Sequence, residues 1–324
     1  MKKVFRNIIF GLLALTTLLS LSVAAADKYP TKTIKVICPW AAGGGTDAIL
    51  RALSAAVEKE LKVTLAVENK TGGAGAIGHA AIKDAKPDGY TLGMVTFELN
   101  SLPQQGLIDF TYADYIPLCL VNADAAALTV KADAPYNSVK EFVEYAKAHP
   151  GEISIGNSAP GSVWHIGAGL LANATGIQVK HVPFEGAAPA VTALAGGHIQ
   201  AVSVSLAEVK SQVEAGNLKV LGVMDEKRAD AFPNVPTFIE QGYDITYYTW
   251  RGMALPKGVD AAIVKTLVDA FAKGIKDEDF LKFAKNMNLN VRYLGPDEFA
   301  AFLKDNFEAV TKTLEETHLL DETK

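Results

Sequence analysis

The feature that most constrains the fold is a strand, a glycine-containing loop and a helix in direct succession, a unit that occurs four times. The four loops lie at residues 43–45, 72–75, 157–162 and 185–187. A short strand-like run precedes each loop, and a stretch with helical periodicity follows it. Strands that alternate with helices of about 10–15 residues are typical of βαβ units. The pattern therefore predicts an α/β protein built on mainly parallel sheets.

These units fall into two groups, one within residues 34–85 and one within residues 153–195. Two such groups predict two lobes of similar plan. After about Trp250 the sequence shows one strand and three helices, too few strands for a third domain. The three helices are expected at residues 260–273, 279–287 and 296–316. We expect this part of the chain to return to the first lobe.

The second lobe is therefore predicted as an insertion into the first. Residues 27–124 and 248–324 would form the first lobe, and residues 125–247 the second. The chain would cross between the lobes through two strands, near residues 122–129 and 245–252. A hinge of two crossing strands allows the lobes to close around a ligand as rigid bodies.

The first 26 residues have the pattern of an export signal. Lys2, Lys3 and Arg6 precede an apolar run of 16 residues, 8–23, and three small alanines end at Ala26. We expect cleavage after Ala26 and a mature protein in the periplasm. The alternative is an uncleaved membrane anchor, but a span needs about 20 apolar residues, more than this run provides.

The charge of the expected mature chain argues against a nucleic-acid partner. The full chain has 31 basic and 36 acidic residues, and the first 26 residues hold three of the basic ones and none of the acidic ones. The mature chain then has 28 basic and 36 acidic residues, a net charge of −8. Nucleic-acid-binding proteins carry a basic surface instead. An anionic ligand would have to be held by local dipoles and not by the overall field.

Motifs for catalysis and metal binding are missing from the sequence. It contains neither G-x-S-x-G nor H-E-x-x-H, and its six histidines and two cysteines lack metal-ligand spacing. We therefore expect no enzyme activity, no cofactor and no metal. Cys38 and Cys119 lie in apolar strand-like runs, which favours two buried free thiols. Export also permits a disulfide between them, and the sequence leaves both states open.

The glycine loops predict a site for an anion. Ligands of parallel α/β sheets bind beyond the carboxyl ends of the strands, where the following helices begin. A helix start presents free N–H groups and about half a positive charge. Gly43, Gly44 and Gly45 let the backbone approach a ligand, with Thr46 or Asp47 as the expected N-cap. Any single loop could be a plain tight turn, but four at equivalent places favour a carboxylate site, and the phosphate-loop motif is missing.

One loop also fits a dinucleotide fingerprint. Gly73, Gly75 and Gly78 have the spacing G-x-G-x-x-G, and Glu98 follows 20 residues beyond, where a ribose-binding acid is expected. A nucleotide-dependent oxidoreductase is thus an alternative. We prefer a binding protein, because this is the second strand-to-helix loop and nicotinamide cofactors are not an obvious resource outside the cytoplasm.

Six segments of the sequence carry a family resemblance. They are Y-P at 29–30 with I-K-V-I-C-P-W-A-A-G-G-G-T-D at 34–47, V-E-N-K-T-G-G-A-G at 67–75, K-P-D-G-Y-T-L at 86–92, H-P-G at 149–151, W-H at 164–165 and V-P-F-E-G at 182–186. Across essentially the whole mature chain, they resemble the receptors of the tripartite tricarboxylate transporters, also called the Bug family.

The resemblance implies a two-lobed periplasmic binding protein fold that closes like a flytrap on a small carboxylate. It also implies delivery of that ligand to a membrane permease of one large and one small subunit. We expect the receptor itself to be a monomer. A sensor that presents the ligand to a signalling partner would need the same closure, so the sequence leaves that alternative open.

The resemblance further implies a set of binding residues at the loops of both lobes. The family's contacts map to Ala42, Gly44, Thr46, Asp47, Gly73 and Ala74 in the first lobe, and to Ser158, His165, Phe184, Gly186 and Ala188 in the second. We add Trp40 and Glu98, which follow the first and third strands. At both positions the sequence departs from the family, which has a smaller aromatic ring at the first and small residues at the second.

Several of these side chains allow two interpretations. Trp40 and Phe184 are either core residues or apolar walls of the cleft. His165 either caps its helix or donates, as a neutral ring, to a carboxylate. Glu98 is expected as a surface acid; if it faces the cleft, it would bind a hydroxyl or ammonium group and favour a hydroxy or amino acid. Arg251 either reaches a ligand carboxylate or serves the hinge.

Overall fold

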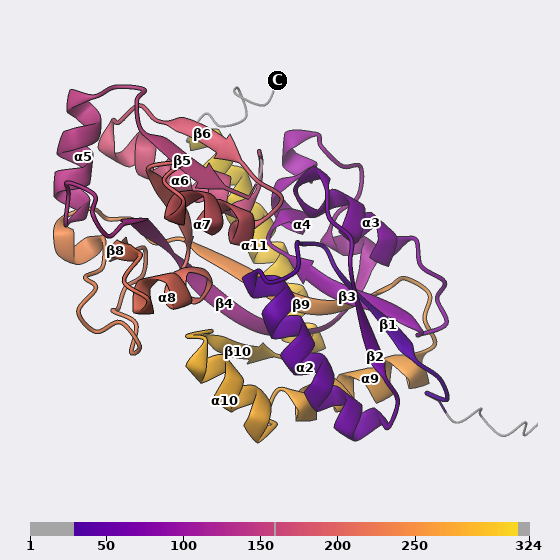
Figure 1. Ribbon diagram of the computed structural model, residues 1–324. Coiled ribbons are helices and arrows are strands. Elements are labelled where there is room, and N and C mark those ends of the chain that lie inside the picture. The colour runs from indigo at the N-terminus through magenta and orange to yellow at the C-terminus, as the bar shows by residue number, and fades with distance from the viewer. Residues whose placement is uncertain (1–28, 159, 317–324) are drawn as a thin grey trace, which may run out of the picture.

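The computed structural model describes residues 29–158 and 160–316, which form two lobes side by side (Figure 1). The predicted export signal and its cleavage after Ala26 lie outside the described residues. Within them, no helix combines the length and apolar character that crossing a bilayer requires. Each lobe contains a sheet flanked by helices.

Three parallel strands form the centre of the first lobe. Their order is β2-β1-β3, and β9 joins antiparallel to β3. The strands are β1 (Ile34–Cys38), β2 (Leu65–Asn69), β3 (Thr91–Thr96), β9 (Tyr248–Pro256) and β10 (Val291–Leu294). The helices are α2 (Gly45–Leu61), α3 (Ala76–Lys83), α4 (Glu98–Ser101), α9 (Ala261–Gly274) and α10 (Glu278–Asn286). Apolar side chains of α2, α9 and α10 share one core with β1 and β3. The C-terminal helices α9 and α10 therefore pack on the first lobe.

The second lobe repeats the plan, with the strand order β6-β5-β7, all parallel. Its strands are β5 (Ser154–Asn157), β6 (Lys180–Pro183), β7 (Ala201–Ser205) and β8 (Leu218–Val223). Its helices are α5 (Val139–Ala148), α6 (Val163–Thr175), α7 (Ala187–Ala195) and α8 (Leu206–Glu214). Single turns of 3-10 helix occur in both parts of the chain: η1 (Gly73–Gly75), η2 (Pro103–Gln105) and η3 (Tyr112–Asp114) before β4, and η4 (Ile239–Gln241) after β8. The helices expected after the third and fourth glycine loops are α6 and α7, whereas α8 was not predicted.

Two long antiparallel strands join the lobes. β4 (Tyr115–Lys131) pairs with β9 as far as Ala125 and with β7 from Ala126 onward. It also pairs with β8 from Ala127. β4 therefore belongs to both sheets, and β9 runs beside it in the first. The predicted fold class is confirmed: two mainly parallel α/β lobes connected by crossing strands, an arrangement that can open and close.

The last helix, α11 (Pro296–Glu316), lies behind the central strands in the view of Figure 1 and contacts β4. Trp250 of β9 packs edge-on against Phe299 of α11 at a centroid distance of 5.9 Å. The side-chain amide of Asn100 in α4 donates to the Leu303 carbonyl of α11 at 2.9 Å. α11 thereby fixes the position of α4, and α4 begins with Glu98.

Both cysteines are buried free thiols, as favoured from the sequence. Cys38 lies in β1 and Cys119 in β4. Burial raises the pKa of Cys38 to about 11 and that of Cys119 to about 12. Both thiols therefore stay protonated at neutral pH and serve as small apolar groups in the core.

Candidate functional site

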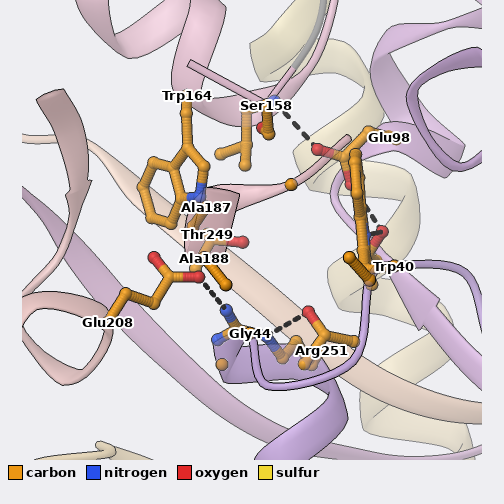
Figure 2. Close-up of a pocket in the computed structure, with 16 residues that line it drawn as sticks. Trp40, Gly44, Glu98, Ser158, Trp164, Ala187, Ala188, Glu208, Thr249 and Arg251 are labelled. Carbon is orange, nitrogen blue, oxygen red and sulfur yellow. Dashed lines mark hydrogen bonds and ion pairs between the residues drawn. The ribbon is translucent and has the colours of Figure 1, made fainter. Parts of the chain in front are cut away.

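A small cavity lies between the lobes, beyond the carboxyl ends of β1 and β3 and beside β9 (Figure 2). Its residues come from both lobes: Trp40, Ala41, Gly44, Gly45, Thr46, Thr96, Glu98, Ser158, Val163, Trp164, Gly186, Ala187, Ala188, Glu208, Thr249 and Arg251. Its volume of about 20 Å³ has room for about one water molecule. Pockets for small ligands are usually larger than about 300 Å³, so this is the closed form of the cleft.

Contacts across the cleft explain why it is closed. The hydroxyl of Ser101 in the first lobe donates to the Gly161 carbonyl of the second lobe at 2.9 Å. The side-chain amide of Gln105 donates to the same carbonyl at 3.0 Å. The Val163 amide of the second lobe donates to the Glu98 carboxylate of the first at 2.9 Å. Entry of a ligand therefore requires these bonds to break and the lobes to separate.

Three helices begin at the cavity. Gly44 and Gly186 are the N-caps of α2 and α7, and Ser162 is the N-cap of α6. Gly186 has φ +126°, a conformation that side chains rarely adopt, so glycine is required for this entry into α7. The first turns of all three helices present N–H groups and the positive ends of their dipoles to the cavity, a feature that favours an anionic group close to them.

Glu98 is a fully buried acid of the cavity lining. Its side chain is 0% exposed. It accepts hydrogen bonds from the Thr96 hydroxyl at 2.5 Å and from the Val163 amide at 2.9 Å. Burial raises the pKa of the Glu98 carboxyl, and the two hydrogen bonds oppose that shift. The expectation of a surface acid is thus wrong, because α6 of the other lobe covers the side chain.

Arg251 is held by a buried ion cluster. It donates to Asp124 of β4 at 2.7 Å and to the Thr46 hydroxyl at 2.9 Å, and it lies 3.5 Å from Glu208 of α8. Burial raises the pKa of the Asp124 and Glu208 carboxyls, and the guanidinium opposes this. Of the two interpretations of Arg251, the structure supports a role in the hinge. Arg251 lies in the crossing strand β9 and bonds to the crossing strand β4. It also contacts Thr46 of the first lobe and Glu208 of the second.

Two tryptophans form apolar walls on opposite sides of the cavity (Figure 2). Trp40 follows β1, and its indole N–H donates to the Thr96 hydroxyl at 3.3 Å. Trp164 lies in the first turn of α6 and is 3% exposed. The cavity therefore combines aromatic faces, helix starts and carboxylates.

The structure brings seven of the thirteen predicted site residues to the cavity: Trp40, Gly44, Thr46, Glu98, Ser158, Gly186 and Ala188. The other six lie outside its lining: Ala42, Asp47, Gly73, Ala74, His165 and Phe184. Ala42 is exposed in the loop before α2, and Phe184 packs against the second-lobe core.

Asp47 supports the first loop from behind. Its carboxylate accepts from the Gly43 amide at 3.0 Å, from the Asn69 side chain at 2.8 Å and from Arg51 at 3.0 Å. The prediction of Thr46 or Asp47 as N-cap is wrong, because α2 starts at Gly45 and is capped by Gly44, two residues before Thr46. Asp47 instead fixes the shape of the glycine loop.

The second glycine loop has a structural explanation. Ala74 adopts φ +55° within η1 and is buried, so the loop turns sharply before α3. A Cβ on Gly78 would lie 2.5 Å from the Pro39 Cα, so this glycine permits close packing of α3 on the end of β1. Close packing therefore accounts for the last glycine of the G-x-G-x-x-G pattern.

His165 acts as a neutral acceptor within its own loop. Its Nδ1 accepts from the Gly161 amide at 3.1 Å, and its ring packs edge-on against His181 at 4.6 Å. Burial, with a smaller effect of His181, lowers the pKa of His165 to about 4. The ring therefore shapes the loop before α6, which fits the capping interpretation better than direct donation to a carboxylate.

Sequence reasoning missed Glu208, Trp164 and Thr249 in the cavity lining. Glu208 had a usable signal, because Ser205-x-x-Glu208 is a capping box directly after β7. Thr249 and Arg251 alternate along β9 and so face the same side. Among the described residues, no group of three His, Cys, Asp or Glu side chains is arranged to hold a metal ion.

Fold and cavity together define a two-lobed solute-binding protein. The chain belongs to the tripartite tricarboxylate transporter family of receptors, since the model of that family matches residues 49–319. These receptors are periplasmic solute-binding proteins and not a class of enzymes.

Individual relatives agree with this assignment. The chain is 31% identical to the UPF0065 protein in gbd 5'region of Cupriavidus necator, over 95% of this chain and 96% of that protein. It is 40% identical to the structure of a TctC solute-binding protein from Polaromonas without ligand, over 89% of this chain and 99% of that one, with a TM-score of 0.66. The periplasmic binding protein BugD is 28% identical over 90% of this chain and 99% of that one, with a TM-score of 0.86.

Proposed function

We propose that this protein captures a small carboxylate between its lobes and delivers it to a tripartite membrane transporter with one large and one small permease subunit. The mature protein starts after Ala26, resides in the periplasm and acts as a monomer. Residues 27–124 and 248–324 move as one lobe and residues 125–247 as the other.

The observation that carries the proposal is the meeting of three helix starts at one cavity between the lobes. Backbone N–H groups at a helix start bind anions without a cationic side chain. This matters here because Arg251 is already engaged by Asp124 and Glu208. The ligand carboxylate would therefore rest on the first turns of α2 and α7, with Gly44 and Gly186 allowing close approach.

Binding is coupled to opening and closing in this proposal. The ligand enters when the bonds from Ser101 and Gln105 to Gly161 are broken, and closure then surrounds it with residues of both lobes. A permease can distinguish the closed, loaded form from the open form because the relative position of the lobes differs between them.

A thermal-shift screen of mono-, di- and tricarboxylates tests the proposal, because a ligand that binds only the folded state raises the melting temperature. Calorimetry on the best acid then compares wild type with Ala188→Glu, which places a carboxylate in the first turn of α7. An acidic residue at a helix start favours the helix, so this variant is expected to fold.

We expect Ala188→Glu to weaken binding at least tenfold through like-charge repulsion. The matched control is Thr192→Glu, which adds the same charge to the same helix at an exposed position and should leave the affinity within twofold. If no carboxylate shifts the melting temperature, or if Ala188→Glu binds as tightly as Thr192→Glu, the proposed function is refuted.

A further inference from the structure

We propose that the cavity selects a carboxylate that also carries a cationic nitrogen, and that Glu98 is the residue that recognises the nitrogen. This inference rests on the proposed function and deepens it from carboxylates in general to zwitterionic, amino-acid-like carboxylates. The buried charges, the geometry of Glu98 and the aromatic walls carry it.

The buried charges around the cavity are unbalanced. Glu98 and Glu208 line the cavity together with Arg251, and Asp124 lies directly behind the guanidinium. Three carboxyl groups thus share one cation. The side chains of Glu98, Asp124 and Arg251 are at most 4% exposed, and that of Glu208 is 5% exposed. Burying a charge without a partner is costly, so a ligand that brings a positive charge into this space is favoured.

Arg251 balances the charge of Glu98 only in part. Its guanidinium is bonded to Asp124 at 2.7 Å and contacts Glu208 at 3.5 Å. Glu98 lies on the side of the cavity away from Arg251, next to Trp40 (Figure 2). The Thr96 hydroxyl and the Val163 amide, which donate to Glu98, are both uncharged. The carboxylate of Glu98 therefore lacks a full counter-charge in its immediate surroundings.

Glu98 also has capacity for further donors. A carboxylate offers about four lone-pair sites, and Thr96 and Val163 each occupy one, on different oxygens. An ammonium group brings donors as well as charge. Trp40 and Trp164 on either side add aromatic faces, which attract cations.

The helix starts and Glu98 together suit a zwitterion. The first turns of α2 and α7 favour a carboxylate, and Glu98 favours a cation. The second carboxylate of a bare dicarboxylate would instead meet Glu98 or Glu208 and be repelled. A hydroxyl group could donate to Glu98 but would leave the charge unbalanced.

Three sets of acids that differ at one substituent test this inference by calorimetry on the full mature protein. The sets are propionate, lactate and alanine; succinate, malate and aspartate; and glutarate, 2-hydroxyglutarate and glutamate. Within each set the hydrogen at C2 is replaced by a hydroxyl or an ammonium group. In the set that binds most tightly, we expect the amino acid to bind at least tenfold more tightly than the bare acid.

Glu98→Gln tests the role of the charge, since the amide keeps the shape and one acceptor. It should reduce the preference for the amino acid at least tenfold. The control Glu144→Gln removes the same charge from the exposed face of α5, where the side chain is 65% exposed, and should leave the preference unchanged. Circular dichroism of both variants checks the fold.

The wild-type ranking alone can overturn the inference, even if Glu98→Gln fails to fold. If the bare or hydroxy acid binds as tightly as the amino acid, Glu98 does not recognise a cation, while the proposed carboxylate receptor stands. An unchanged preference in folded Glu98→Gln has the same consequence. If none of the nine acids binds, the inference falls, and the wider screen of mono-, di- and tricarboxylates decides the proposed function.

Discussion

Replacing Arg251 by methionine removes the cation at the centre of the buried ion cluster. The Arg251 side chain is 2% exposed, and it donates to Asp124 at 2.7 Å and to the Thr46 hydroxyl at 2.9 Å. Glu208 lies 3.5 Å away, and its side chain is 5% exposed. Methionine fills much of the same volume, so the main change in Arg251→Met is the loss of charge and of donors.

The expected destabilisation at pH 7 is about 3–5 kcal/mol, because breaking a buried ion pair leaves an uncompensated buried charge. Two features keep the loss from being larger. Asp124 retains hydrogen bonds from the Asn122 side chain at 2.6 Å and from the Asn290 amide at 2.8 Å. Glu208 retains the amide and hydroxyl of Ser205.

The destabilisation should shrink as the pH falls. Without the guanidinium, burial raises the pKa of Asp124 and Glu208 further above their unfolded values of about 4. A carboxyl with a raised folded-state pKa binds more protons when folded, so its contribution to stability grows as the pH falls toward the unfolded pKa. The difference between wild type and Arg251→Met should therefore be clearly smaller at pH 5 than at pH 7.

Urea denaturation followed by circular dichroism at both pH values measures this difference. The control Arg228→Met breaks an exposed pair with Glu240, whose side chains are 43% and 45% exposed, and should cost at most about 1 kcal/mol at either pH. A loss below about 1 kcal/mol for Arg251→Met at pH 7, or a loss that does not shrink at pH 5, would refute the reasoning.

Three further predictions concern the fold. Burial lowers the pKa of His79 to about 3, so the free energy of unfolding decreases as the pH falls below about 6.5. Between pH 6 and 4.5 this loss is about 2 kcal/mol. Urea titrations of His79→Asn should no longer show it. Gly78→Ala brings a Cβ to 2.5 Å from Pro39 and should cost about 1–3 kcal/mol in the same assay. Cys38 and Cys119 should react with a thiol reagent only after unfolding, and fast labelling of the native protein would contradict their burial.

Local signals explain why much of the fold was predictable. Ser138 before α5 accepts from the Glu141 amide, because an N-cap side chain needs only one turn of chain. The glycine loops likewise reveal the ends of β1 and β5 within a few residues. The strand periodicity around residue 122 also indicated the crossing strand β4.

Contacts between distant segments explain what the sequence did not predict. The burial of Glu98 depends on the Val163 amide, 65 residues away and in the other lobe. Asp124 of β4, which accepts a hydrogen bond from Arg251, is 127 residues away in the sequence. Helix α8 was missed because it follows β7 directly at Ser205, without a glycine loop to mark its start.

The location of the bound carboxylate is the most direct test of the proposed function. A crystal structure of the protein with the acid that raises its melting temperature most would provide it. We predict carboxylate oxygens about 3 Å from first-turn amides of α2 and α7, between the two lobes. An acid bound outside the cleft, or one held inside it with its carboxylate turned away from these helix starts, would contradict the proposal.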